Sequence, residues 1–150
     1  MESPPLSSCP IRLFVCLVGA VSPSAIPVVC ALIERGGLVL VAQRPAHKHL
    51  PLKWEFPGGK VEPGETPESA IVREIKEELA CDIVLLRALP TFPHDYGPVT
   101  IMMIPFVCQL TAESAEPQLN EHLALQWVKP EALSALDLAA ADLPVVTSYR

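Results

Sequence analysis

The sequence predicts an α+β domain built from layers of helix and sheet. Short β-prone runs are mixed with helical segments, without the strict βαβ order of a parallel-sheet fold. No repeat or low-complexity run interrupts this pattern, and 150 residues is the length of one domain that can bury a substantial core. We therefore expect a single layered domain.

An N-terminal extension, rich in Pro and Ser and flexible, is expected over residues 1–25, with the domain itself over residues 26–150. The apolar run 11–21, followed by Ser-Pro-Ser-Ala, superficially resembles a secretory signal. It lacks a charged leader, since Arg12 lies inside the run and Glu2 is acidic, and the run is too short to span a bilayer. We favour a loosely attached extension or a start upstream of the natural one, and we expect no membrane partner.

The domain begins with a predicted hairpin. Residues 28–34 and 38–43 are β-prone runs separated by a Gly36-Gly37 pair, which is typical of a tight turn. A further short strand over residues 54–56 leads into a Pro-Gly-Gly turn.

A helix is predicted over residues 66–79. Thr66 can cap its N-terminus, Pro67 suits the first helical position, and Glu68 lies in the first turn, where the helix dipole favours an anion. The apolar spacing predicts a buried stripe formed by Val72, Ile75 and Leu79.

Three strands and two short helices are expected to complete the domain, over residues 83–89, 99–110, 123–128, 130–136 and 143–149. The strand over residues 99–110 is expected to be broken or bulged at Pro105. Residues 93–98 contain two prolines, Asp95 and Gly97, which predicts a turn.

Three glutamates share one face of the predicted helix. Glu74, Glu77 and Glu78 are spaced i, i+3 and i+4, so their carboxylates project from neighbouring positions. Clustered hard oxygen ligands suit Mg²⁺ or Mn²⁺, and Mg²⁺ usually binds a few carboxylates together with substrate phosphates. The alternative interpretation is the solvated face of an acidic surface helix.

The net charge of −6 is concentrated near this helix. Residues 55–82 hold eight of the seventeen acidic residues and only three bases, which leaves −5 in that window. The sequence has no basic stripe of the kind that binds a nucleic-acid backbone, so a small nucleotide held through metal is favoured over a polymer. The five cysteines are odd in number and contain no CxxC pair, which favours reduced, mostly structural thiols and a cytoplasmic location.

Residues 59–78 resemble the Nudix box at every charged position. They read Gly59, five residues, Glu65, seven residues, Arg73-Glu74, a hydrophobic residue, any residue, and Glu77-Glu78. One departure is Ala80, where the family usually has a glycine with positive φ at the helix C-terminus. The resemblance implies the Nudix fold, a mixed β-sheet sandwiched between helices.

The resemblance extends over residues 26–147 and is closest to the MutT-like nucleoside triphosphate pyrophosphohydrolases. The further matching segments are AQRPA (42–46), WEFPGGK (54–60), Asn120-Glu121-His122 with Trp127, and ADLP (141–144). It implies hydrolysis of a nucleoside triphosphate to monophosphate and pyrophosphate with Mg²⁺ as cofactor, or Mn²⁺ in its place, as in nucleotide-pool sanitation. The metal ligands that it implies are the carbonyl of Gly58 and the carboxylates of Glu74, Glu77, Glu78 and Glu121.

The resemblance also implies roles in catalysis. Arg73 and Glu65 match a supporting pair in which the guanidinium holds the carboxylate bidentately and orients the catalytic helix. Glu74 and Glu78 match the two candidates for the general base that takes the proton of the attacking water. The sequence does not choose between them.

Four residues match positions near the nucleoside in MutT-like enzymes: Arg44, His49, Phe56 and Asp142. Relatives that remove 8-oxoguanine nucleotides have asparagine at the last position. An ionised aspartate can only accept, so it favours amino or N–H donors and repels a carbonyl unless it is protonated. Aspartate in this context resembles the CTP and modified-pyrimidine enzymes, while other relatives read oxidised purines with aspartates, so both substrate classes stay open.

Two other functions share parts of this pattern. ADP-ribose pyrophosphatases carry the box and often a downstream proline, which Pro98 could match, although prolines are frequent in this chain. Nudix modules that bind nucleotides without cleaving them usually lose box carboxylates, and this chain keeps them. A monomer and a homodimer are both compatible with the sequence. His47 and His122 are expected to face solvent, and Trp54 and Trp127 to pack in the core or on the sheet.

Overall fold

The computed structural model describes residues 25–149, so residues 1–24 of the predicted extension lie outside the described residues. In the described part of the chain the strands are β1 (Ile26–Arg35), β2 (Leu38–Gln43), β3 (Trp54–Glu55), β4 (Gly58–Lys60), β5 (Ile83–Ala88), β6 (Phe92–Asp95), β7 (Thr100–Leu110) and β8 (Ala124–Val128). The helices are α2 (Pro67–Leu79) and α3 (Leu143–Tyr149), with the 3-10 helices η1 (Pro130–Ala135) and η2 (Ala140–Asp142).

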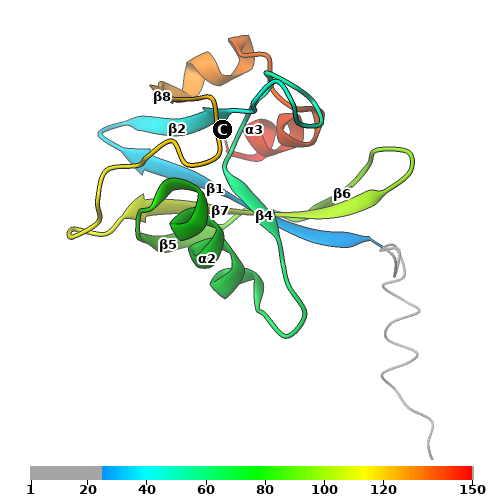
Figure 1. The fold of residues 1–150 in the computed structure, drawn as a ribbon, viewed down its shortest axis with the longest axis horizontal. Coiled ribbons are helices and arrows are strands. Elements are labelled where there is room, and N and C mark those ends of the chain that lie inside the picture. The colour runs from blue at the N-terminus through cyan, green and yellow to red at the C-terminus, as the bar shows by residue number, and fades with distance from the viewer. Residues whose placement is uncertain (1–24, 150) are drawn as a thin grey trace, which may run out of the picture.

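These strands form one mixed sheet around β1 (Figure 1). β1 runs parallel to β7 and antiparallel to β2 and β4, while β3 and β8 pair with β2, and β5 and β6 pair with β7. Gly36 and Gly37 join β1 to β2 with φ values of 58° and 80°, as the predicted hairpin requires. The mixed sheet with helices outside it confirms the predicted α+β class.

Alternate residues of β1 contribute to two separate cores. Val29, Ala31 and Ile33 pack with the buried residues of α2, whereas Cys30 and Leu32 pack with residues of η1 and α3. This alternation follows from the two-residue period of a strand that is buried on both faces. Figure 1 shows α2 on one side of the sheet and α3 on the other, so the sheet is sandwiched between helices as the resemblance implied.

Helix α2 begins as predicted, and two of the three residues of its predicted buried stripe, Ile75 and Leu79, are buried. The backbone N–H of Ser69 donates to Thr66 Oγ1 at 3.1 Å, which confirms the N-terminal cap, and Pro67 occupies the first turn. The predicted stripe is wrong at Val72, whose exposed fraction is 40%. Ile71 takes its place in the core, and the buried residues of the helix are Ala70, Ile71, Ile75, Glu78 and Leu79.

Ala80 ends this helix in the left-handed conformation, with φ 56° and ψ 32°, and its N–H donates to the Lys76 carbonyl at 3.1 Å. Because a Cβ is strained in this region, replacing Ala80 with Gly is expected to raise the free energy of unfolding by about 1 kcal/mol. Urea denaturation measures this change. Ala70→Gly, inside the same helix, is the control and should lower stability by about 1 kcal/mol or more. Equal effects of the two substitutions would contradict the expectation.

Two predictions in the second half of the domain are wrong. Phe92–Asp95 forms β6, with His94 opposite Ile101, so only the chain after Asp95 turns, where the Tyr96 N–H donates to the Val99 carbonyl at 2.8 Å. Pairing with the long strand β7 overrides the local turn preference. Pro105 does not break β7, because its carbonyl still accepts from the Leu89 N–H at 3.0 Å. The irregularity lies instead in β5, between residues 85 and 87.

Cys30, Cys81 and Cys108 are free and buried, as expected for structural thiols, while Cys9 and Cys16 lie outside the described residues. Trp54 and Trp127 pack against the two cores, as predicted. Among residues 25–149, no helix has the length and apolar character needed to cross a membrane.

Candidate active site

Arg73 is the centre of an ion-pair network on α2. Its Nε and Nη2 donate to the two carboxylate oxygens of Glu65 at 2.6 and 2.9 Å, the bidentate contact that the sequence predicted. Nη1 reaches Glu74 at 3.1 Å and Glu77 at 3.2 Å, and Nη2 also donates to the Lys60 carbonyl at 3.0 Å. Hydrogen bonds from Arg73 lower the pKa of Glu65 to about 2. One guanidinium thus joins the helix to β4 and to the loop before the helix.

Two glycines bring β4 close to its neighbours. A Cβ on Gly59 would lie 2.4 Å from the carboxylate carbon of Glu74, so only glycine leaves room for this carboxylate against the strand. A Cβ on Gly58 would lie 1.9 Å from the Val29 carbonyl oxygen on β1. The Pro-Gly-Gly segment therefore sets the distance between the helix carboxylates and the sheet.

Glu78 is a buried carboxylate with one oxygen left without a partner among the described residues. Its exposed fraction is 9%, and within residues 25–149 no hydrogen-bond donor reaches its Oε1. Burial, with the negative charges of Glu74, Glu55 and Glu121, raises the pKa of Glu78 to about 9. An orphaned oxygen surrounded by like charge fits a site for a divalent cation.

The predicted metal ligands are all oxygen atoms, which is the type of ligand that a divalent cation such as Mg²⁺ prefers. The carboxylates among them do not converge on one point. Within the described residues no three Asp, Glu, His or Cys side chains are close enough together to form a metal site. Glu74 and Glu77 turn to Arg73, while Glu121 lies 3.8 Å from the Nζ of Lys48. The repulsion expected between bare carboxylates accounts for this arrangement.

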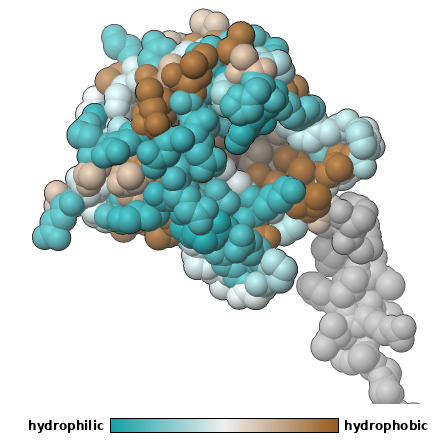
Figure 2. Space-filling model, in the orientation of Figure 1, coloured by the Kyte–Doolittle hydropathy of each residue, from teal (hydrophilic) through white to brown (hydrophobic). Residues whose placement is uncertain are grey.

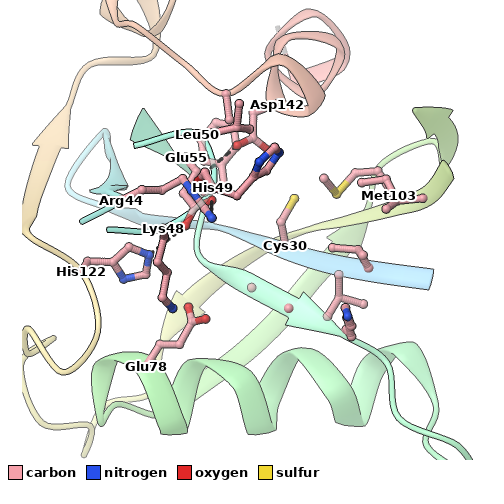
Figure 3. Close-up of a pocket in the computed structure, with 18 of the residues that line it drawn as sticks. Cys30, Arg44, Lys48, His49, Leu50, Glu55, Glu78, Met103, His122 and Asp142 are labelled. Carbon is pink, nitrogen blue, oxygen red and sulfur yellow. Dashed lines mark hydrogen bonds and ion pairs between the residues drawn. The ribbon is translucent and has the colours of Figure 1, made fainter. Parts of the chain in front are cut away.

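A cavity of about 430 Å³ connects the predicted metal and nucleoside residues (Figure 3). Figure 2 shows the hollow between a largely hydrophilic surface and a hydrophobic patch near β6. Its lining includes the predicted metal ligands Gly58, Glu78 and Glu121, together with the predicted nucleoside residues Arg44, His49, Phe56 and Asp142. Glu65, Arg73, Glu74 and Glu77 lie beside it and are not part of its wall.

Asp142 lies at the end of the cavity away from Glu78 (Figure 3). The residue is 4% exposed, and its carboxyl accepts a hydrogen bond from the Phe56 N–H at 3.4 Å. Burial, followed by the charge of Glu55, raises the pKa of Asp142 well above its ordinary value. The environment thus favours the neutral acid, which can donate a hydrogen bond as well as accept one. A base that presents a carbonyl to Asp142 is therefore no longer disfavoured.

A polar network that the sequence did not reveal supports the wall of the cavity. Arg44 donates to Glu55 Oε1 at 3.0 Å and to the His49 carbonyl at 2.6 Å, while Glu55 Oε2 lies 2.9 Å from Nε2 of His122. The prediction that His122 faces solvent is wrong, since only 5% of its side chain is exposed. The resemblance included the segment Asn120-Glu121-His122, but no local pattern indicates a partner for His122 that lies 67 positions earlier in the chain.

Cys30, Ile101, Met103 and Tyr96 add the apolar part of the wall. Their places could have been found from the alternation along β1 and β7, because Cys30, Ile101 and Met103 pack in the same core as Leu32. Tyr96 stands edge-on to His49, with ring centres 5.8 Å apart. The result is an apolar slot with polar groups at both ends, a form typical of small-molecule sites.

Comparison with known proteins gives the site a family context. The chain is 36% identical over 124 residues to a CTP pyrophosphohydrolase of Escherichia coli, a match that covers 83% of this chain and 90% of the relative. It is 48% identical over 58 residues to an 8-oxo-dGTP diphosphatase of Proteus vulgaris, covering 39% of this chain and 52% of the relative. Both relatives carry the names of enzymes that act on nucleoside triphosphates.

The fold is shared with solved structures as well. A solution structure of the Escherichia coli ORF135 protein superposes with a TM-score of 0.74 at 35% identity, over 84% of this chain and 89% of that one. The NUDIX domain family matches residues 23–149. The resemblance drawn from the sequence is confirmed, together with its fold and the hydrolase class, and the chain belongs to the NUDIX family.

Proposed function

We propose that this protein hydrolyses a nucleoside triphosphate to the monophosphate and pyrophosphate, with Mg²⁺ as the required cation and Mn²⁺ as a substitute. The observation that supports this most directly is the single cavity that joins Glu78 at one end to Asp142 at the other. An orphaned carboxylate at the phosphate end and a donor-acceptor group at the base end are what a nucleotide substrate requires. The names of the relatives support the same reaction.

The residues divide into three roles. Glu74, Glu77, Glu78, Glu121 and the Gly58 carbonyl would hold the cation. When bound, Mg²⁺ neutralises phosphate charge and lowers the pKa of an attacking water. Arg73 orients the helix through Glu65, and Glu78 is favoured over Glu74 as general base because Glu78 lines the cavity and Glu74 does not.

The base end of the cavity is proposed to accept an oxidised purine such as 8-oxoguanine or a cytosine-type pyrimidine, in the manner of a nucleotide-pool sanitation enzyme. As a neutral acid, Asp142 can donate to a carbonyl, and as an anion it can only accept from amino or N–H groups. We therefore expect the preference for 8-oxo-dGTP over CTP to fall as pH rises and Asp142 loses its proton.

Asp142→Asn tests this role. Because the amide donates and accepts at every pH, the variant should favour 8-oxo-dGTP more than the unmodified protein does, by about tenfold at the alkaline end of the range. The ratio of the two kcat/KM values should also lose its pH dependence. The measurement is that ratio from pH 6 to pH 9 for both proteins. Identical profiles would remove Asp142 from base selection.

The reaction itself is tested with purified protein, Mg²⁺ and a panel of 8-oxo-dGTP, dCTP, 5-methyl-dCTP, ordinary nucleoside triphosphates and ADP-ribose, with products identified by mass. Monophosphate plus pyrophosphate from a triphosphate is expected. Cleavage of ADP-ribose alone would make this a sugar-nucleotide pyrophosphatase, and nucleotide binding without cleavage would make it a binding module.

The three buried free thiols support a reducing, cytoplasmic location.

A further inference from the structure

Lys48 is a cation inside the cavity to which the sequence motifs assign no role. It lies in the loop between β2 and β3 and lines the cavity together with Glu78 and Glu121. Figure 3 shows its side chain extending along the cavity toward Glu78 and away from Asp142. The positive charge of Lys48 is therefore at the end where the phosphates of a nucleotide would lie.

We propose that Lys48 binds the phosphate chain of the substrate and that, without nucleotide, its ammonium group serves as a counterion for Glu121. This inference rests on the proposed function and adds a phosphate-binding residue to it. The distance of 3.8 Å between Lys48 Nζ and Glu121 Oε1 is the observation that carries it.

The pair with Glu121 is weak enough to be exchanged. Each side chain is 45% exposed, and ion pairs with that exposure contribute little to stability. A triphosphate offers several charged oxygens, and charge-assisted hydrogen bonds to them are stronger than hydrogen bonds between neutral groups. Transfer of the ammonium group to phosphate would also leave Glu121 free to bind a cation.

Of the other two basic residues in the cavity wall, Arg44 is less available for this purpose. Arg44 already donates to Glu55 and to the His49 carbonyl, and these contacts hold it in the wall. Lys60 also lines the cavity, from β4, and its main-chain carbonyl accepts from Arg73 Nη2. Lys48 is the cavity lysine whose charge is already paired with a predicted metal ligand.

The loop that carries Lys48 is fixed, so only the side chain needs to move. The Arg44 N–H donates to the Lys53 carbonyl at 2.9 Å, and the Leu52 N–H donates back to the Arg44 carbonyl at 3.1 Å. Leu50 and Leu52 hold left-handed conformations, with φ values of 54° and 63°. The Lys48 N–H also donates to the Pro45 carbonyl at 3.3 Å, so hydrogen bonds within the loop place the backbone of Lys48 at the cavity.

The test compares Lys48→Gln, Lys48→Arg and Lys53→Gln. Lys53 is the matched control because it lies in the same loop, pairs with Asp137 at 2.7 Å and is not part of the cavity wall. Binding of inorganic tripolyphosphate with Mg²⁺, measured by calorimetry, should weaken about tenfold in Lys48→Gln. It should change less than about threefold in Lys48→Arg and remain unchanged in Lys53→Gln.

Titration with Mn²⁺ alone provides a second readout. Lys48→Gln should bind Mn²⁺ at least as tightly as the unmodified protein, because the competing ammonium group has been removed from Glu121. A structural defect would weaken Mn²⁺ and tripolyphosphate together. In steady-state assays the KM for the triphosphate should rise more than kcat falls.

Unchanged tripolyphosphate binding in Lys48→Gln, an equal loss in Lys53→Gln, or no binding by the unmodified protein would overturn the proposal for Lys48. Weaker Mn²⁺ binding in Lys48→Gln would do the same. If the unmodified protein binds tripolyphosphate but cleaves none of the nucleotide panel, the proposed reaction fails, while the comparison of the variants still decides the role of Lys48.

Discussion

Replacing Glu78 with Gln is expected to lower kcat at least about a hundredfold, the scale on which loss of a general base acts. The amide has nearly the same size as the carboxylate, so the packing of α2 against the sheet should be kept. What is lost is a carboxylate that would bind the cation through the buried Oε1 and, once ionised, take a proton from water. Steady-state kinetics with the best substrate of the panel measures the effect, and Glu74→Gln measured in parallel compares the two candidates. Near-normal turnover by Glu78→Gln with intact Mn²⁺ binding would reject the role.

The stability of the metal-free protein provides the control for this variant. Because burial raises the pKa of Glu78 to about 9, the folded state holds a proton that the unfolded chain releases near pH 4.5. The stabilisation that protonated Glu78 gives the folded state is therefore fully present below the pKa of the unfolded chain, and it is lost as the pH rises toward the folded pKa of about 9. Glu78→Gln should lack that loss and be at least as stable as the unmodified protein at pH 8. Thermal unfolding from pH 5 to pH 9 in the presence of a chelator tests this.

Alanine at Gly59 is expected to lower kcat about a hundredfold with little change in Tm. The new Cβ would lie 2.4 Å from the Glu74 carboxylate, which is the far end of a flexible side chain and can move aside. The fold then survives, but Glu74 and its contact with Arg73 are displaced. Displacements of about 1 Å at catalytic groups can cost a hundredfold in rate.

Gly58→Ala is the matched comparison for that variant. Its Cβ would lie 1.9 Å from the carbonyl oxygen of Val29, and backbone in the central strand cannot move aside cheaply. This variant should therefore lose stability as well as activity, with a Tm lower by several degrees. Thermal unfolding and kcat measured on both variants distinguish the two effects. Equal Tm losses, or full activity in Gly59→Ala, would contradict the proposed geometry.

The parts of the fold that follow local rules were predictable from the sequence. The cap at Thr66, the helix over residues 67–79 and the hairpin at Gly36-Gly37 each rest on contacts between near neighbours in the chain. The Arg73 contact with Glu65 was predicted because the spacing of a known motif already encodes a spatial relation. Resemblance to a family supplies the long-range information that local patterns lack.

The predictions were wrong where the burial of a side chain depends on segments far away in the chain. Apolar spacing alone is compatible with burial of either Val72 or Ile71. Packing of α2 against the sheet buries Ile71 and leaves Val72 exposed. His122 is buried because Glu55, far away in the chain, provides its partner. The ionisation of Asp142 likewise depends on burial by several segments that the sequence does not place around it.

The two ends of the cavity belong to opposite layers of the molecule. Glu78 comes from α2 on one face of the sheet, and Asp142 comes from η2, next to α3 on the other. If Asp142 selects the base, as we propose, mutations around residues 136–149 would alter which base is recognised and leave the acidic residues of α2 unchanged. Such independence would let one ancestral hydrolytic centre diversify across many nucleotides, in keeping with relatives named separately for CTP and for 8-oxo-dGTP.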